Sequence, residues 1–464
     1  MPGLLTFSAI LFYSDNLTPD QYGVYSLIIA VIGVLNIVFL DWFRFGVARF
    51  MPEYISKGTS ASFLIFIKNK VKITIFLLIF ITGLVYSIFD FIPNLGIERW
   101  MVLVIGALLL LQYIYTLFTR IIITEMKPKI FMWANFMKTI LAVSASISLI
   151  TAGYGYQSLL IGISLGLASS NLYLLIKIKF PRSKFTFKTD RALFKKIVFY
   201  SLPLAASAGF SYVLSFSNRF IINHFRGVSE TGLFSLGFDF SQQTIGVFIS
   251  IAATSAFPIA MKIYAEDGNG VKLKKHMNTT LWMLFAITIP IVIIFAATSR
   301  DIISLFLGAE FSKLDYLVIP IISLNTFIMG IKGFYFDLYF YIKKETRYQL
   351  LILIGIAVVN IILNILLIPI YGYVAAIWVS LFTSVLAVFV TYIVTNKLLK
   401  IKISLSPLIK TVLAALVMFL TIKMFGDTRE HIYFIIKIII GLFVYVALSI
   451  LFNKTLVMNL IHKK

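Results

Sequence analysis

The sequence predicts an all-α polytopic membrane protein with about 14 transmembrane helices, and three observations lead to this fold class. The 464 residues are 60% hydrophobic and only 13% charged, with a mean hydropathy of +0.97, whereas a soluble domain carries about 25% charged residues. Apolar runs of about 20 residues, the length that a helix needs to cross a bilayer, recur along the whole chain. Short alternating segments, which would indicate a transmembrane barrel, are not the pattern.

Fourteen apolar runs of helical length follow one another along the chain. They cover residues 1–13, 22–50, 73–91, 100–123, 130–151, 157–176, 198–222, 232–262, 277–298, 316–341, 348–368, 373–396, 407–425 and 432–452. The first run would be only about 20 Å long, which is short for a hydrocarbon core of about 30 Å. We therefore expect the native chain to begin upstream of Met1, so that the first helix is truncated in this sequence.

The loop charges predict the orientation. Twenty-nine lysines and arginines fall in the segments on the side of the N-terminus, and five fall in the opposite loops. Since basic residues accumulate in cytoplasmic loops, both termini are predicted to be cytoplasmic. The same rule accounts for the net charge of +22. Nucleic-acid binding is not expected, because no segment outside the membrane is long enough to fold as a domain.

The residues needed for several kinds of chemistry are missing from the sequence. There is no cysteine, which excludes disulfides, thiol nucleophiles and thiolate metal sites. The four histidines are scattered without the spacing of metal ligands. We expect no metal, no cofactor and no enzymatic activity.

Two sequence matches divide the chain into repeated halves. Tyr22–Leu27 resembles Thr231–Leu236 at an offset of 209 residues, and Tyr154–Tyr156 matches Tyr371–Tyr373 at an offset of 217. Between the halves lies Lys177–Ile197, which holds eight basic residues and one acid, Asp190. We predict an N-terminal lobe (1–176), a basic cytosolic linker (177–197), a C-terminal lobe (198–396) and two extra helices (397–464). The two six-helix lobes should be related by a pseudo-twofold axis along the membrane normal.

Three stretches near the N-terminus resemble a known family. They are Pro2-Gly3-Leu4-Leu5, the turn Leu17–Leu27 (LTPDQYGVYSL) and Gly46–Tyr54 (GVARFMPEY). Together with the layout of the spans, they are similar to the Wzx-type flippases of O-antigen and capsule repeat units. This family belongs to the multidrug/oligosaccharidyl-lipid/polysaccharide exporter superfamily.

The resemblance implies a function in the bacterial cytoplasmic (inner) membrane. Such proteins move an undecaprenyl-diphosphate-linked oligosaccharide from the inner to the outer leaflet by alternating access, without an ATP site. The absence of a Walker-type loop from this sequence agrees with that. The implied partners are the lipid-linked oligosaccharide, the bilayer, a polysaccharide polymerase and a chain-length regulator. The driving force stays open between H⁺ coupling, Na⁺ coupling and the membrane potential.

Charged residues inside the predicted spans are the candidates for a functional site, because a charge in a membrane helix usually faces a cavity or a partner. A diphosphate crossing a medium of low dielectric constant needs compensating cations. The candidate substrate-cavity residues are therefore the basic ones, Arg44, Lys138, Arg219 and Lys332. Lys138 lies about 13 Å beyond Lys129 along one helix, near mid-membrane; its alternative role is a structural hydrogen bond between helices.

The candidate gating or ion-coupling residues are Asp41, Arg120, Asp239 and Asp337. Asp41 and Arg44 are spaced i,i+3 and can neutralise each other. Arg219 and Asp239 can form a structural pair; otherwise Asp239 is a coupling carboxylate. Arg120 and Asp337 stand at equivalent positions in the two halves. They would form a cytosolic gate, or each would pair locally, as Arg120 could with Glu125.

Three other functions are compatible with parts of the pattern. A cation-coupled multidrug exporter of the same superfamily would favour acidic rather than basic residues in its cavity. A lipid II flippase would share both the fold and the basic cavity, so the sequence separates it only weakly. An O-antigen polymerase would need a long outer loop with catalytic residues, and the longest outer loop here, Ser299–Tyr316, is too short.

Overall fold

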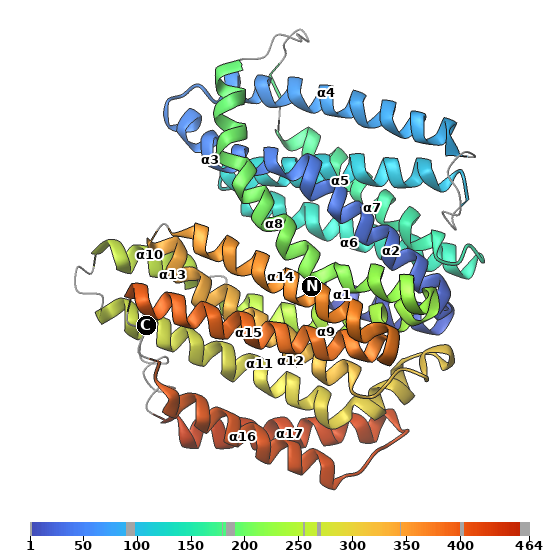
Figure 1. Ribbon diagram of the computed structural model, residues 1–464, viewed down its shortest axis with the longest axis vertical. Helices are drawn as coiled ribbons and strands as arrows, with labels where there is room; N and C mark the ends of the chain where they lie inside the picture. The colour runs from blue at the N-terminus through green and yellow to red at the C-terminus, as the bar shows by residue number, and fades with distance from the viewer. Residues whose placement is uncertain are drawn as a thin grey trace. The chain divides into compact units, whose positions relative to one another are not determined.

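A computed structural model describes residues 2–89, 98–178, 180–181, 191–253, 256–266, 271–343, 345–399 and 403–454. Within these ranges every regular element is a helix and no strand occurs (Figure 1). Ten of the described helices are long and apolar enough to cross a membrane. The predicted all-α, multi-pass membrane fold is confirmed, and about 14 membrane helices are compatible with the structure.

The first half of the chain forms seven α-helices and one π-helical segment. They are α1 (Pro2–Asn16), α2 (Pro19–Leu35), η1 (Asn36–Asp41), α3 (Trp42–Ser56), α4 (Ser60–Ser87), α5 (Met101–Thr124), α6 (Pro128–Thr151) and α7 (Gln157–Ile178). The single span predicted for residues 22–50 is a continuous rod, α2–η1–α3. Its middle switches to i→i+5 hydrogen bonding, the pattern of π-bulges that recur at functional sites.

The second half is longer, and two of its helices, α8 and α11, are much longer than predicted. Its elements are α8 (Arg191–Arg226), α9 (Val228–Ala253), α10 (Ala256–Glu266), α11 (Val271–Phe306), η3 (Ala309–Phe311), α12 (Val318–Ile331), η4 (Lys332–Phe336), α13 (Asp337–Lys343), α14 (Thr346–Tyr371), α15 (Tyr373–Leu399), α16 (Leu405–Met424) and α17 (His431–Phe452). Helix α8 begins inside the predicted linker, so the last seven linker residues are helical and continuous with a membrane helix. Helix α11 bends at Thr298, whose φ of −118° and ψ of 16° are not helical.

The repeated Tyr-Gly-Tyr match lies at a connection between two helices in both halves, which is longer between α6 and α7 than between α14 and α15. Gly155 has φ +54° before α7, and Gly372 has φ +64° between α14 and α15. Glycine adopts this left-handed conformation without a steric penalty. At Gly372 an added Cβ would also lie 2.6 Å from a carboxylate oxygen of Glu230 and would displace the side chain that accepts the Tyr373 amide.

Contacts divide the chain into two compact units. Unit 1 comprises residues 1–9 and 24–217, and unit 2 comprises residues 10–23 and 218–464. The division falls inside α8, whereas the repeat places the start of the second lobe at residue 198. The lobe boundaries and the pseudo-twofold axis stay predictions.

In unit 1, small residues bring α6 and α7 into close contact. Gly162, Gly166 and Ser170 recur every fourth residue on α7. An added Cβ at Gly166 would lie 2.3 Å from the Lys138 carbonyl oxygen on α6. The Ser170 hydroxyl donates to the Ala134 carbonyl at 2.9 Å. Small residues and inter-helix hydrogen bonds of this kind drive helix association in membranes, where the lipid removes the hydrophobic driving force.

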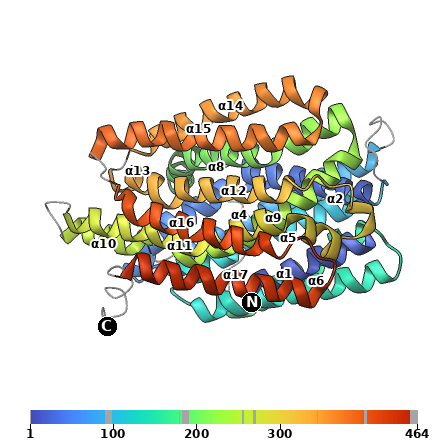
Figure 2. The same ribbon diagram turned by 90° about the horizontal axis from the view of Figure 1, so that it is seen from below.

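In unit 2, amide side chains connect α8, α14 and α15. The Asn364 Nδ2 donates to Oδ1 of Asn218 and of Asn360, at 2.9 Å each. The Asn360 Nδ2 donates to Thr383 Oγ1 at 3.0 Å. All four residues are buried. This network fixes α14 beside α15, as Figure 2 shows.

Helices α16 and α17 lie side by side, with α16 packed against α11 (Figure 1), and a buried ion pair attaches α17 to α11. Lys437 Nζ on α17 lies 2.5 Å from Asp301 Oδ2 on α11. The same ammonium donates to the Gly426 carbonyl at 3.0 Å, and Asp301 Oδ1 accepts the Thr428 amide. Both side chains are almost inaccessible, at 1% and 0% exposure. Sequence analysis did not single out this pair.

Replacing Lys437 by methionine should destabilise the protein by about 3–5 kcal/mol, because the buried Asp301 carboxylate loses its counter-charge. The exposed pair Lys423–Asp427 (3.6 Å) provides the control, and Lys423→Met should change stability by less than about 0.5 kcal/mol. Thermal unfolding in detergent measures both. The double variant Asp301→Leu, Lys437→Met should recover most of the loss, and equal destabilisation by the two single methionine variants would contradict this role.

Candidate functional site

The charged residues of helix α12–η4–α13 form a local ion pair in unit 2. Lys332 Nζ lies 2.9 Å from each carboxylate oxygen of Asp337. Residues five apart do not face each other on an α-helix, but the i→i+5 hydrogen bonding of η4 shifts Asp337 onto the side of Lys332. Gln349 on α14 donates to Asp337 Oδ2 at 3.1 Å and to the Tyr341 hydroxyl at 3.2 Å. The charge of Lys332, which is 2% exposed, is therefore compensated by its own helix.

Arg219 and Asp239 also pair in unit 2, which was one of the two alternatives left open by the sequence. The Arg219 guanidinium on α8 lies 2.5 Å from Asp239 Oδ1 on α9. The Arg219 side chain is 1% exposed, whereas that of Asp239 is 26% exposed. The second carboxylate oxygen accepts a hydrogen bond from the Tyr22 hydroxyl at 3.0 Å. Tyr22 was not among the predicted site residues, although it lies in the LTPDQYGVYSL motif, which is helical from Pro19 onward.

Two glycines at matching repeat positions bring Tyr22 to Asp239. An added Cβ on Gly23 would lie 2.3 Å from the Val228 carbonyl oxygen, and one on Gly232 would lie 1.8 Å from the Pro19 carbonyl oxygen. Both contacts join the start of α2 to the start of α9 within unit 2. The repeat offset of 209 residues thus relates two positions that pack at one helix crossing, where neither backbone tolerates a side chain.

Lys138 has a different environment, in unit 1. Its ammonium on α6 lies 4.7 Å from the centre of the Tyr115 ring on α5, and the side chain is half-buried. The Tyr115 hydroxyl donates to Asn135 Oδ1 at 3.3 Å. In the part of the chain that the structure describes, no carboxylate forms an ion pair with Lys138. An aromatic face compensates this cation, and an anion could approach it.

The other three predicted site residues lie in unit 1. Arg44 is half-buried on α3, with its guanidinium 4.9 Å from the Phe45 ring. Arg120 is half-buried near the end of α5, and Glu125, its predicted local partner, pairs with Lys127 at 2.6 Å. Asp41 ends η1, but its side chain lies outside the described part, so its pairing with Arg44 stays a prediction. The pairing of Arg120 with Asp337 also stays a prediction.

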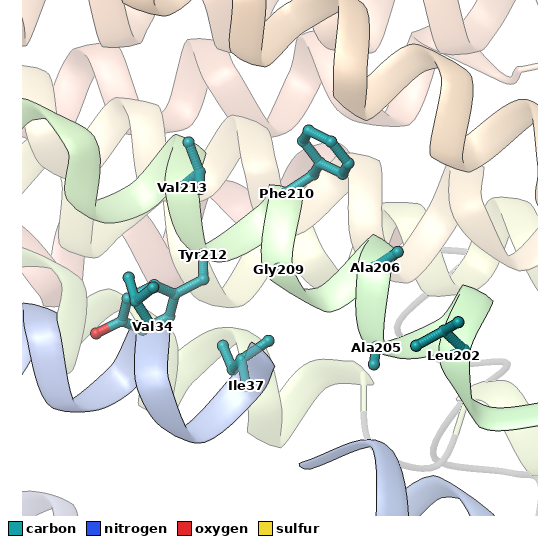
Figure 3. A pocket seen from close by; sticks show the side chains of 9 residues that line it. All are labelled: Val34, Ile37, Leu202, Ala205, Ala206, Gly209, Phe210, Tyr212 and Val213. Atoms are coloured by element: carbon teal, nitrogen blue, oxygen red, sulfur yellow. The ribbon is translucent and has the colours of Figure 1, made fainter. Parts of the chain in front are cut away.

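An apolar cavity of about 330 Å³ lies in unit 1 between the rod α2–η1 and helix α8 (Figure 3). Its lining comprises Val34, Ile37, Leu202, Ala205, Ala206, Gly209, Phe210, Tyr212 and Val213. The Tyr212 hydroxyl donates to the carbonyl oxygens of Ile29 and Ala30, 3.3 Å from each. This contact requires Gly33, because an added Cβ there would lie 1.8 Å from that hydroxyl. Sequence analysis gave no indication of the cavity.

No group of His, Asp or Glu side chains in the described ranges is arranged to hold a metal ion.

Comparison with known proteins finds one matching family and several solved structures with a similar fold. The family model described as polysaccharide biosynthesis protein matches residues 17–315. A structure of the lipid II flippase MurJ in an inward closed conformation is similar with a TM-score of 0.78 and 17% identity, over 98% of each chain. An inward-facing multidrug resistance MATE family transporter of the MOP superfamily is similar with a TM-score of 0.67 and 15% identity, over 86% of this chain and 94% of that chain. An outward-facing MATE structure gives 0.60 and 14% identity, over 85% and 93%.

No curated protein matches the sequence. The structural similarities show that this chain has the fold of the transporters in the MOP superfamily.

The close contacts of Gly23 and Gly232, where α2 crosses α9, can be tested by substitution. Gly23→Ala and Gly232→Ala should each lower the yield of folded protein, because the new methyl group would overlap a backbone carbonyl. Gly246→Ala, on the same helix α9 but with open space around it, should be neutral or stabilising by up to about 1 kcal/mol. Size-exclusion profiles and melting temperatures in detergent measure this, and tolerance of alanine at both crossing positions would refute the packing argument.

Proposed function

The chain belongs to the polysaccharide biosynthesis protein family, and we propose that it carries undecaprenyl-diphosphate-linked oligosaccharide repeat units from the inner to the outer leaflet of the bacterial cytoplasmic membrane. The product would serve O-antigen, capsule or exopolysaccharide synthesis. The transporter fold and the helices of membrane-spanning length support transport across a bilayer. A polysaccharide polymerase and a chain-length regulator would act on the delivered unit.

The observation that carries the proposal is Lys138 on its aromatic support. A cation in a membrane helix is costly unless it has a partner, and among described residues Lys138 contacts a ring rather than a carboxylate. A diphosphate would supply the missing anion. The adjacent Tyr115 ring offers a flat surface of the kind against which sugar rings pack. A cationic drug would be repelled by the same ammonium, which counts against a function as a multidrug exporter.

The two pairs of unit 2 would take part by exchanging partners. Arg219 and Lys332 are each held by a carboxylate. Protonation of Asp239 or Asp337, or Na⁺ binding to them, would release the cation for a phosphate group. This exchange would couple an H⁺ or Na⁺ gradient to alternating access.

Lys138 can be tested by following translocation directly. The protein is reconstituted in liposomes with lipid-linked oligosaccharide in the inner leaflet, and the glycan that becomes accessible to an added glycosidase is measured over time. Lys138→Gln should slow translocation about tenfold or more, because a charge-assisted hydrogen bond contributes about 1.5–3 kcal/mol. The control Lys129→Gln removes an exposed lysine from the start of the same helix and should behave as wild type.

Wild-type liposomes that do not differ from empty ones, combined with dye efflux driven by an ion gradient, would favour the multidrug exporter instead. Equal translocation rates for Lys138→Gln and wild type would contradict a role of Lys138 in binding the transported lipid.

The predicted gate has its own test. Arg120→Asp and Asp337→Arg should each abolish translocation, and the double reversal should restore part of it if the two residues pair during the cycle. Asp337 also pairs with Lys332, so Lys332→Gln alone serves as the control for loss of the local pair. A double reversal as inactive as the single variants would refute the gate.

A lipid II flippase is the second candidate. The fold likeness to MurJ extends over 98% of both chains, more than for the MATE structures. Lipid II presents the same polyprenyl diphosphate with a different glycan, so Lys138 would suit it equally. Competition between lipid II and oligosaccharide-linked lipid in the liposome assay separates the two.

A further inference from the structure

The α2–α8 cavity has no part in holding phosphate or sugar. Its lining is hydrocarbon, and the one polar group, the Tyr212 hydroxyl, is directed at the α2 backbone (Figure 3). A cavity without available hydrogen-bond partners stays dry and takes apolar molecules. A glycan or a diphosphate placed there would leave its polar groups unsatisfied. The chemistry of the lining therefore selects a hydrocarbon.

The volume and the opening fit a chain rather than a small molecule. An apolar cavity of about 150 Å³ accommodates benzene, so 330 Å³ corresponds to about a dozen carbon atoms, or two isoprene units. Leu202 is 59% exposed, and Ala206 beside it is also exposed. The cavity therefore opens at these two residues. A long chain could thus enter sideways and leave its remainder in the bilayer.

The shape of the α8 wall favours a methyl-branched chain. Ala205, Ala206 and Gly209 form a concave surface, and an added Cβ at Gly209 would reach only Ile37, at 3.7 Å. Small side chains of this kind leave room for methyl branches beside a bound chain, and filling that room gains dispersion contacts. A polyprenyl chain carries a methyl group on every isoprene unit and fills more of this space.

The same helix carries cations at its inner end. Arg191, Lys195 and Lys196 are exposed in the first two turns of α8, and residues 191–217 contain no acid. Lys70 on α4 adds a further cation, 3.8 Å from the ring centre of Phe194. Leu202, where the cavity begins, lies about 9 Å beyond Lys196 along the helix axis. One lipid molecule can therefore place its anionic head group at these cations and its attached hydrocarbon chain in the cavity.

We propose that the α2–α8 cavity binds the polyprenyl chain of the transported lipid, while the basic start of α8 holds its diphosphate during capture from the inner leaflet. This inference rests on the proposed function and names a tail subsite within it. The subsite lies wholly in unit 1.

The test uses undecaprenyl diphosphate with a photoreactive diazirine in its isoprenoid chain as the probe. The reconstituted full-length protein is irradiated, and labelled peptides are identified by mass spectrometry. Label should concentrate on residues 202–213 of α8 and around Val34 and Ile37. Unlabelled undecaprenyl diphosphate should compete, and phosphatidylglycerol at the same concentration should not.

Matched variants localise the effect. Gly209→Leu should fill the cavity and lower labelling at these positions about tenfold, since several buried methylene contacts are lost. Ala206→Leu, at the exposed mouth, should lower it as well, and it decides the question if Gly209→Leu does not fold. Gly83→Leu on α4 is the control, because nothing lies within 4 Å of its added Cβ.

Labelling that is unaffected by both cavity variants, or equal competition by phosphatidylglycerol, would overturn the tail subsite. The glycosidase assay separates this from the proposed function. Translocation by wild type with label elsewhere would reject the subsite and leave the flippase intact. Label that is confined to the cavity and removed by the competitor, in protein that does not translocate, would support the subsite and reject the proposed transport from the inner to the outer leaflet.

Discussion

The need to compensate charge in a medium of low dielectric constant governs the polar part of this structure. An isolated cation in a membrane helix is costly, and the protein meets this cost in more than one way. Lys332 and Lys437 are each buried against a carboxylate. Lys138 is supported by an aromatic ring, and among the described residues it has no carboxylate partner. The Lys437 pair joins α17 to α11, whereas the Lys332 pair lies within one helix and Lys138 contacts an aromatic ring on the neighbouring helix α5.

Departures from regular helix geometry create the contacts that matter most. The π-helical segment η4 brings Lys332 and Asp337 to one face, which an α-helix of the same sequence would not do. A second π-helical segment, η1, begins beside the apolar cavity. The crossing of Gly23 and Gly232 lets the start of α2 reach α9.

The proposed functions divide one amphiphilic substrate among chemically different surfaces. The polyprenyl chain would contact the apolar lining of the α2–α8 cavity, and the diphosphate would contact the cations at the start of α8 and Lys138. The carboxylates of unit 2 would control when their own cations are free. Such a division avoids placing any part of the substrate against groups that cannot satisfy it.

The sequence by itself determined the all-α membrane class and the approximate position of the helices, because hydropathy is a local property. It also identified Arg219, Asp239, Lys332 and Asp337 as charges that need an explanation, but it left their partners open. Only the tertiary structure decided that Tyr22 joins Asp239 across 217 residues, that Asp301 pairs with Lys437 across 136 residues, and that a cavity lies along α8. Partners across helices depend on the rotation and close approach of each helix, which small residues and π-helical segments set and which no local pattern encodes.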